Sequence, residues 1–150
     1  MTKLANAIWM TVFIKDDEDY SALSEKFNKL VPLDLEAEKL KINEKNATGF
    51  SERRIKIKEI MLSKDRHIRA FLENLSSKLG ESQKKELIEQ SESRLDSEQN
   101  FFLRLDKIRM TMSNDWILTD EGNCFHIKIS VAAFPKTREN ALNAVKQIFK

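Results

Sequence analysis

The chain has 150 residues, of which 41% are hydrophobic and 33% are charged, and its formal net charge is +2. These values are typical of a soluble globular protein and exclude a histone-like, strongly basic chain. Any nucleic-acid-binding function must therefore depend on where the cations lie rather than on their sum. The single cysteine excludes an internal disulfide and is typical of a reducing compartment, so we expect a cytoplasmic protein.

The N-terminal stretch, residues 4–15, is rich in aromatic and β-branched side chains and predicts a largely buried strand. It lacks the cleavage signature of a signal peptide and is too short to span a bilayer, so we expect no membrane contact. The acidic run Asp16–Asp19 suits the start of a helix. Apolar residues at spacings of three and four follow, and Pro32 ends the predicted helix.

Two segments then alternate between apolar and polar residues, residues 35–45 and residues 53–62, with a cluster of turn-forming residues at 46–49 between them. This pattern predicts a hairpin that buries Ile55 and Ile57. The opposite face of the hairpin is then basic, and it carries Lys39, Lys41, Arg54, Lys56 and Lys58.

A helix is predicted from an N-cap at Ser63 to a stop at Gly80, and a second helix, with a weaker apolar face, over residues 82–95. The C-terminal third predicts a hairpin of residues 101–107 and 124–134 joined by a long connection, and then a helix capped by Thr137. Trp116 lies in the connection, where we expect burial; exposed, it would be a platform for stacking or for a partner.

This order of elements predicts an α+β fold, a two-layer sandwich in which helices cover one face of a mainly antiparallel sheet. We expect one domain over residues 1–150, with residues 63–97 as a helical excursion between two hairpin halves.

The C-terminal hairpin carries the most informative pattern. A period of two places Arg104, Asp106, His126 and Lys128 on one face. The sequence Arg-Leu-Asp-Lys at 104–107, Ile-Lys-Ile at 127–129 and Ala-Ala-Phe-Pro-Lys at 132–136 with Arg138 resembles a family of small archaeal proteins, described as predicted exosome-associated RNA-binding proteins. The resemblance implies a fold similar to the large-subunit ribosomal protein that contacts 5S ribosomal RNA, or loosely to a double-stranded-RNA-binding domain.

Three groups of cations are candidate RNA contacts. The basic hairpin face could follow phosphates, with Arg104 and Lys128 extending it, or could be a solvated face or a lysine-protected edge. Arg104 and Lys107 could touch RNA while Asp106 orients Arg104, or all three could form a structural ion network. Lys136 and Arg138 flank the start of the last helix, where a phosphate could bind, although Pro135 and Thr137 also simply stop a strand and cap a helix.

Motifs of catalysis are absent from the sequence: it has neither a glycine-rich phosphate loop nor a Gly-x-Ser-x-Gly motif. His67 and His126 lack partners at ligand spacing, with His126 expected to face outward, and Cys124 is expected to be a small core or strand-end residue. The run Asp16–Asp19 could hold a hard cation but is better explained by the helix start. We therefore expect no enzyme activity, no cofactor and no metal.

The sequence thus predicts a non-catalytic RNA-binding protein that contacts the phosphate backbone of structured RNA through a basic sheet face, in association with RNA processing, the exosome or ribosome-related proteins. The alternative is a protein-interaction adaptor or a homodimerising structural module that does not bind RNA. Its support is the near-neutral total charge and the thin apolar face of the helix at 82–95.

Overall fold

The computed structural model describes residues 3–49 and 52–150. Five strands form one sheet in the order β2-β3-β1-β5-β4, with every neighbouring pair antiparallel. The strands are β1 (Ala5–Lys15), β2 (Asn43–Thr48), β3 (Arg54–Leu62), β4 (Asn100–Asp106) and β5 (Cys124–Val131). The helices are α1 (Tyr20–Asn28), α2 (Asp65–Glu89), α3 (Ser91–Arg94), α4 (Lys107–Ser113) and α5 (Arg138–Ile148).

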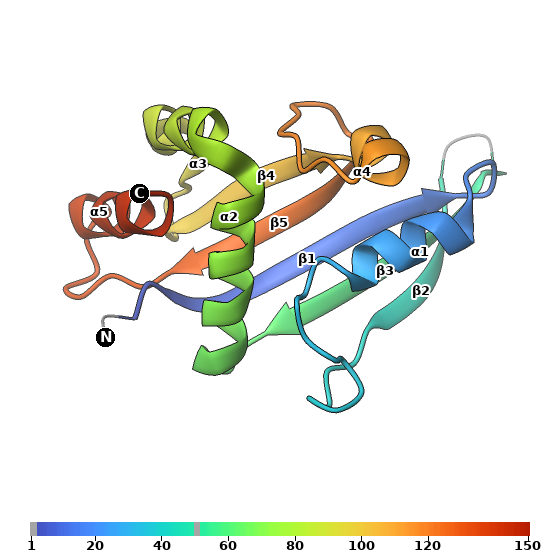
Figure 1. Cartoon of the computed structure of the whole chain (residues 1–150), viewed down its shortest axis with the longest axis horizontal. Coiled ribbons are helices and arrows are strands. Elements are labelled where there is room, and N and C mark those ends of the chain that lie inside the picture. Colours follow the sequence, from blue (N-terminus) through green and yellow to red (C-terminus); the bar gives the residue numbers. More distant parts are fainter. Residues whose placement is uncertain (1–2, 50–51) are drawn as a thin grey trace.

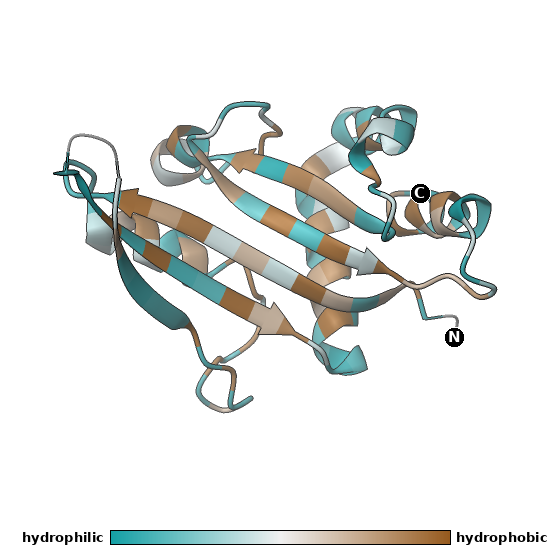
Figure 2. Ribbon diagram, turned by 180° about the vertical axis from the view of Figure 1, so that it is seen from behind, coloured by the Kyte–Doolittle hydropathy of each residue, from teal (hydrophilic) through white to brown (hydrophobic). Residues whose placement is uncertain are grey.

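All of these helices lie on one side of the sheet, and α2 crosses over its middle (Figure 1). Seen from behind, the strands are not covered by any helix (Figure 2). The prediction of a two-layer α+β sandwich with helices on one face is therefore confirmed. Among residues 3–49 and 52–150, none of the helices combines the length and the hydrophobicity that spanning a bilayer requires.

The core lies between the sheet and the helices, and the central strand β1 sets it up. Ile8, Met10, Val12 and Ile14 alternate along β1 and are at most 2% exposed, so they face the helical layer. Large side chains of α1, α2, β4, β5 and the C-terminal end of α5 complete this core: Phe27, Phe71, Leu75, Phe101, Phe125 and Phe149.

Several helix boundaries follow from local chemistry. The carboxylate of Asp19 accepts a hydrogen bond from the Ala22 amide at 3.0 Å and starts α1. The hydroxyl of Thr137 accepts from the Asn140 amide at 3.1 Å and starts α5, as predicted.

The bounds of α2 agree with the prediction only in part. Gly80 has φ 76° and ψ 169° and breaks α2, which confirms the predicted interruption. The predicted cap at Ser63 is wrong, because α2 starts after Lys64 without a side-chain cap.

The segment before β2 differs from the prediction. Residues 35–42 are not a strand, because Asp34 accepts hydrogen bonds from the amides of Glu36 and Ala37 at 3.1 and 3.2 Å and folds the chain into turns. The alternating apolar side chains Leu40 and Ile42 pack against the core from this irregular segment. The predicted turn at 46–49 is also wrong for residues 46–48, which belong to β2.

The outer edge of β4 is lined by other parts of the same chain. Leu95 bridges to Phe101, and Leu118 bridges to Leu105. Three backbone carbonyls of this edge accept hydrogen bonds: Asn100 O from Asp96 N at 2.9 Å, Phe102 O from Arg94 Nη1 at 3.3 Å, and Arg104 O from Thr119 N at 3.0 Å.

The connection that carries Leu118 and the buried Trp116 is fixed to α2 by the side-chain amide of Gln83. Its nitrogen donates to Trp116 O at 2.7 Å, and its oxygen accepts from Leu118 N at 2.8 Å.

Candidate nucleic-acid interface

The basic residues of β3 do not lie on the open face of the sheet, which is the face that no helix covers. Lys56 and Lys58 align with Ile14 and Val12 of β1, which face the helices, and Lys58 is only 8% exposed. Ile55 and Ile57 therefore lie on the open side, the reverse of the prediction. The phase of the alternation is set by Ile60 and Leu62, which share a face with the two lysines and are buried.

The two lysines of β3 make cation–π contacts with Tyr20 at the start of α1. The Nζ atoms of Lys56 and Lys58 lie 4.7 and 5.3 Å from the centroid of its ring. The Tyr20 hydroxyl donates to the carboxylate of Glu44 on β2, and this hydrogen bond raises the pKa of Tyr20. Lys56 and Lys58 thus belong to a cluster that joins α1 to the sheet edge.

The other predicted cations of the first hairpin also lie away from the open face. Lys39 and Lys41 precede β2 and are not part of the sheet. Arg54 aligns with Thr48, on the same side of the sheet as Lys56. The predicted single surface, formed by these five cations and extended by Arg104 and Lys128, is therefore wrong.

The predicted face of the C-terminal hairpin is confirmed. Arg104 lies opposite His126, and Phe102 lies opposite Lys128. These four side chains alternate with buried neighbours, so the predicted residues Arg104, His126 and Lys128 share the open face with Phe102. Asp106 follows the same alternation, but its carboxylate caps α4 by accepting from the Arg109 amide at 2.9 Å. It does not orient Arg104, whose guanidinium donates to the carbonyl of Asp120 at 2.9 Å.

Lys107 is a buried structural cation rather than a surface contact, and it is 3% exposed. Its Nζ donates to the carbonyl of Phe13 at 2.6 Å and to the two carboxylate oxygens of Glu18 at 3.0 and 3.2 Å. These three bonds use all three donors of the ammonium group. Lys107 therefore ties the start of α4 to the end of β1, which corrects its assignment as an RNA contact.

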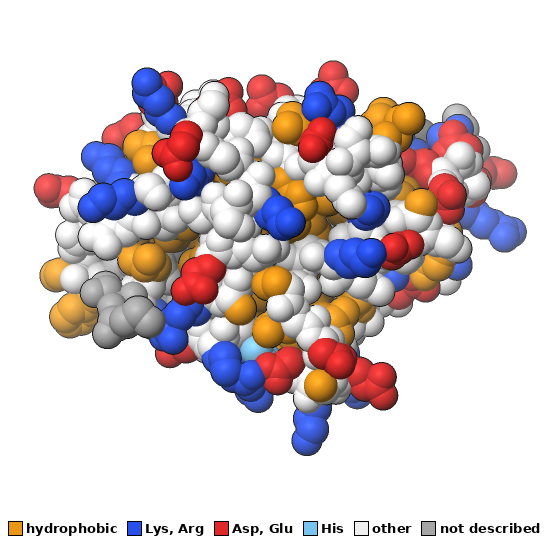
Figure 3. Space-filling model, in the orientation of Figure 1, with side chains coloured by type: hydrophobic (Ala, Val, Ile, Leu, Met, Phe, Trp, Pro, Cys, Tyr) orange, Lys and Arg blue, Asp and Glu red, His pale blue; other side chains and the backbone are white. Residues whose placement is uncertain are grey.

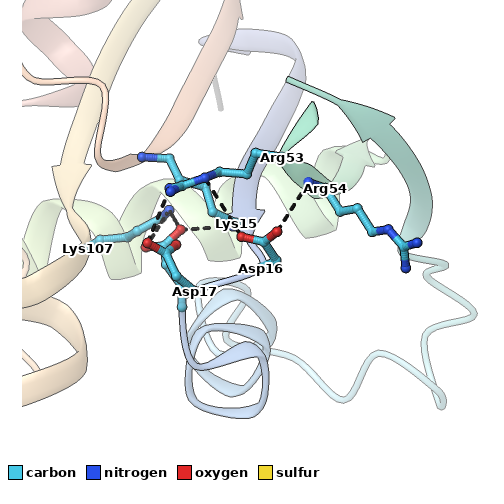
Figure 4. Close-up of polar contacts among 7 residues, drawn as sticks. Lys15, Asp16, Asp17, Arg53, Arg54 and Lys107 are labelled. Carbon is cyan, nitrogen blue, oxygen red and sulfur yellow. Dashed lines mark hydrogen bonds and ion pairs between the residues drawn. The ribbon is translucent and has the colours of Figure 1, made fainter. Parts of the chain in front are cut away.

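The acidic run after β1 also has structural partners, as Figure 4 shows. Arg53 lies 3.8 Å from Asp16 and 3.2 Å from Asp17, and the Arg54 amide donates to Asp16 at 3.4 Å. The interpretation of this run as helix-start residues is confirmed for Asp19, while Asp16 and Asp17 hold the turn before β3. In the part of the chain that the structure describes, no group of three or more acidic, histidine or cysteine side chains could hold a metal.

The predicted phosphate site at the start of α5 is only partly open. Arg138 donates to the backbone carbonyls of Leu95 and Glu92 at 3.1 and 2.5 Å and so fastens α5 to α3. Lys136 lies on the surface, and the neighbouring Phe134 is 98% exposed.

The open face of the sheet is organised in rows that cross the strands. A polar row spans all five strands because the register aligns one polar side chain from each: Asn43, Glu59, Thr11, His126 and Arg104. On one side of it lies a row of Lys45, Ile57 and Phe13. On the other side lies a row of Met61, Trp9, Lys128 and Phe102. Polar groups are thus flanked by aromatic side chains and cations.

The aromatic side chains of this face were not among the sequence candidates. The Nζ of Lys128 lies 4.6 Å from the centroid of the Trp9 ring, and the rings of Phe102 and His126 are 5.7 Å apart. Phe13 is 53% exposed. A usable signal existed in β1, since Thr11 has the same parity as Trp9 and Phe13 and a polar residue on that side indicates an open face.

A hollow of about 500 Å³ opens between the polar row and the row that contains Phe13. Its walls include Phe13, Ile57, Glu59, Arg104 and His126. The hydroxyl of Thr11 donates to the carboxylate of Glu59 at 3.2 Å. Burial, with help from the positive charges of Arg104 and Lys128, lowers the pKa of His126, so its imidazole is neutral at physiological pH.

Cys124 also borders this hollow. It is 8% exposed, and burial raises the pKa of its thiol, so it is a small strand-end residue as predicted and is poorly suited to nucleophilic chemistry.

Comparison with known proteins shows the family to which the chain is similar. A family model described as RNA binding matches residues 7–131, which run from β1 to the end of β5. The chain is 28% identical over 144 residues to the RNA-binding protein PAB1135 of Pyrococcus abyssi, covering 95% of this chain and 92% of that protein.

Solved structures share the fold. Protein AF2318 from Archaeglobus fulgidus superposes with a TM-score of 0.84 at 23% identity, covering 96% of this chain and 99% of that one. Mth689, a DUF54 protein from Methanothermobacter thermautotrophicus, has a TM-score of 0.77 at 24% identity, covering 98% of this chain and 99% of that one.

Proposed function

We propose that this chain, which belongs to the family described as RNA binding, binds RNA on the open face of its sheet without catalysing a reaction. The observation that carries the proposal is the set of crossing rows, in which a polar track is flanked by aromatic side chains and cations. Aromatic rings on an open sheet can stack on bases, while lysine and arginine neutralise phosphates.

The charges of the open face support this assignment. By register, the strand residues Lys15, Lys45, Arg104 and Lys128 project on this side, and the carboxylates there are Glu59 and Asp106. Asp106 is engaged as the cap of α4. The face therefore carries a local excess of positive charge, although the whole chain is nearly balanced.

The helical side is a weaker candidate. Lysine and arginine side chains are intermixed with acidic ones over this side (Figure 3). Lys56 and Lys58 lie over the Tyr20 ring, beside Glu44, and Arg138 is bonded to the backbone of α3. Of the cations named from the sequence, we therefore propose Arg104 and Lys128 as contacts, with Lys136 at the margin.

Two matched triple variants test the proposal. Lys45→Gln, Arg104→Gln and Lys128→Gln together should weaken binding to an RNA hairpin with a single-stranded overhang. The slope of log affinity against log salt should also flatten by about two to three, because each lost phosphate contact removes about 0.7–0.9 of a released counterion. The control combines Lys41→Gln, Arg54→Gln and Lys56→Gln, which removes the same charge elsewhere.

The control variant should bind RNA nearly as well as the unchanged protein at equal salt, apart from the small effect of lower net charge. Anisotropy titrations at four salt concentrations measure both variants, and circular dichroism checks that each is folded. A greater loss in the control than in the open-face variant would contradict the proposed surface.

We also propose the association with the exosome or ribosome-related machinery that the motif resemblance implies. Its support is the sequence at 104–107 and 132–138, of which Phe134 and Lys136 are exposed. Co-elution with a reconstituted archaeal exosome in gel filtration tests it. The same column tests the alternative of a homodimer: the chain should elute as a 17.5 kDa monomer if the open face is kept for RNA.

A further inference from the structure

We propose that the hollow on the open face receives one unpaired RNA base and that the carboxylate of Glu59 selects guanine. This inference rests on the proposed function, because it concerns the same surface. It adds the class of nucleotide that the surface recognises and the residue that reads it.

The hollow has the size and walls of a ligand site. Its volume of about 500 Å³ falls within the range of about 300–1,000 Å³ that small-molecule pockets show. Phe13 and Ile57 supply an apolar wall, and Phe13 is 53% exposed. A flat base can stack on this ring, which then loses its contact with water.

A surface that binds RNA only through its phosphates is not expected to carry a carboxylate such as that of Glu59. A carboxylate among Lys45, Arg104 and Lys128 repels the RNA backbone and lowers affinity. Its chemistry is that of an acceptor, because both oxygens take hydrogen bonds from N–H groups. The structure therefore pairs phosphate-binding cations with one group suited to the donor edge of a base.

Guanine matches this acceptor better than the other bases. On its Watson–Crick edge, the ring N1–H and the exocyclic amino group lie side by side and can make two parallel bonds to a carboxylate. Adenine and cytosine present an amino group beside an unprotonated ring nitrogen, which repels the second oxygen. Uracil presents one N–H between two carbonyl oxygens, which repel both.

The surroundings of Glu59 hold the carboxylate in place for this role. The Thr11 hydroxyl donates to Oε2 at 3.2 Å, which uses one of about four lone-pair positions of the group. Lys45 and Arg104 line the same hollow, where they can contact the phosphates of the bound nucleotide. His126, with a neutral imidazole, can donate one further hydrogen bond and accept another.

The target base has to be unpaired. In a duplex the Watson–Crick edge of guanine is already bonded to cytosine, and its face is covered by stacking. The structured RNA expected from the sequence would accordingly be bound at a loop, a bulge or an end.

The experiment uses the full chain and ten-nucleotide oligouridylates whose one central position is guanine, inosine, adenine or uracil. We expect guanine to bind tightest and adenine about 5- to 150-fold more weakly, the range of one lost bidentate contact. Inosine, which keeps N1–H and lacks the amino group, should fall between them. Competition anisotropy at fixed salt gives the four affinities.

Glu59→Gln separates base reading from electrostatics. The variant should bind the guanine oligomer more weakly but the all-uridine oligomer as well or better, since a negative charge has left the basic face. Glu59→Ala should behave alike if the carboxylate is the reading group. The control is Glu89→Gln, which removes the same charge from an exposed position of α2 on the helical side of the molecule. It should leave the preference for guanine unchanged.

The outcomes distinguish this inference from the proposed function. Equal affinity of the unchanged protein for all four oligomers, with open-face cations still required, would overturn guanine selection and leave RNA binding on this face intact. A guanine preference that survives Glu59→Ala would overturn the role of Glu59. RNA binding that is indifferent to the open-face triple variant would overturn the proposed function itself.

Discussion

The two strands that flank β1 carry the same local pattern with opposite facing. In β3 the sequence Ile55-Lys56-Ile57-Lys58 turns its lysines to the helical side, and in β5 the sequence Ile127-Lys128-Ile129 turns its isoleucines there. Ile127 and Ile129 are fully buried, whereas Ile55 and Ile57 are half-buried on the open face.

The difference comes from the register with β1. Lys56 and Lys58 lie opposite Ile14 and Val12, while Lys128 lies opposite Trp9 on the other face. The ring of Tyr20 then provides a place for the two inward-directed ammonium groups. Alternation thus predicts the period of a strand, but its phase depends on which neighbour the strand pairs with.

The largest expected effect tests this contrast directly. Ile127→Ala should lower the free energy of unfolding by about 2–5 kcal/mol, because it leaves a cavity in a fully packed site. Ile57→Ala, the same change on the open side of β3, should cost less than about 1.5 kcal/mol, since that side chain keeps contact with water in the native state. Urea denaturation of both variants measures the difference, and equal losses would mean that the facing of β3 is wrong.

A smaller effect separates the two cations of the Arg-Leu-Asp-Lys sequence. Lys107→Met should cost about 1–3 kcal/mol, because it removes the ammonium group that donates to the Phe13 carbonyl and to both oxygens of the Glu18 carboxylate. Arg104→Met should cost about 0–1 kcal/mol, as for exposed polar contacts, yet weaken RNA binding. Thermal unfolding and anisotropy on both variants check the pair. A destabilised Arg104→Met variant with normal RNA binding would make Arg104 structural.

The smallest effect concerns His126 of β5. Burial lowers its pKa in the folded state below the ordinary value of 6.5, so the unfolded chain takes up the proton first as pH falls. The stabilisation from neutral His126 is therefore complete above pH 6.5 and is lost as pH falls through the folded-state pKa. His126→Gln should lose less stability between pH 7 and pH 5 than the unchanged protein does. An identical pH dependence would show that the imidazole is not desolvated.

Much of the fold could be predicted from the sequence because its determinants are local. The cap at Asp19, the break at Gly80 and the cap at Thr137 each depend on residues within one helical turn. The burial of Lys107 could not be predicted, since its partner Glu18 lies 89 positions away. The turns after Asp34 were missed because two apolar residues with a spacing of two mimic a strand.

The candidate site was predicted in part for the same reason. Arg104, His126 and Lys128 belong to one hairpin, so a period of two was enough to place them together. Trp9 and Phe13 belong to the stretch that is predicted to be largely buried, because β1 has apolar side chains on both faces. The contact of Glu59 with Thr11 could not be predicted, since it depends on the register between β3 and β1.

The covered outer edge of β4 has a consequence for how the protein behaves at high concentration. Strand addition by a second chain needs unpaired backbone groups at a sheet edge, and the carbonyls of β4 are already bonded to its own chain. Growth of the sheet is therefore confined to β2. That strand reads Asn-Glu-Lys-Asn-Ala-Thr and lacks a large apolar side chain, so it offers an incoming strand little surface to bury. The sheet resists aggregation because the chain itself covers the β4 edge and because the β2 edge is polar.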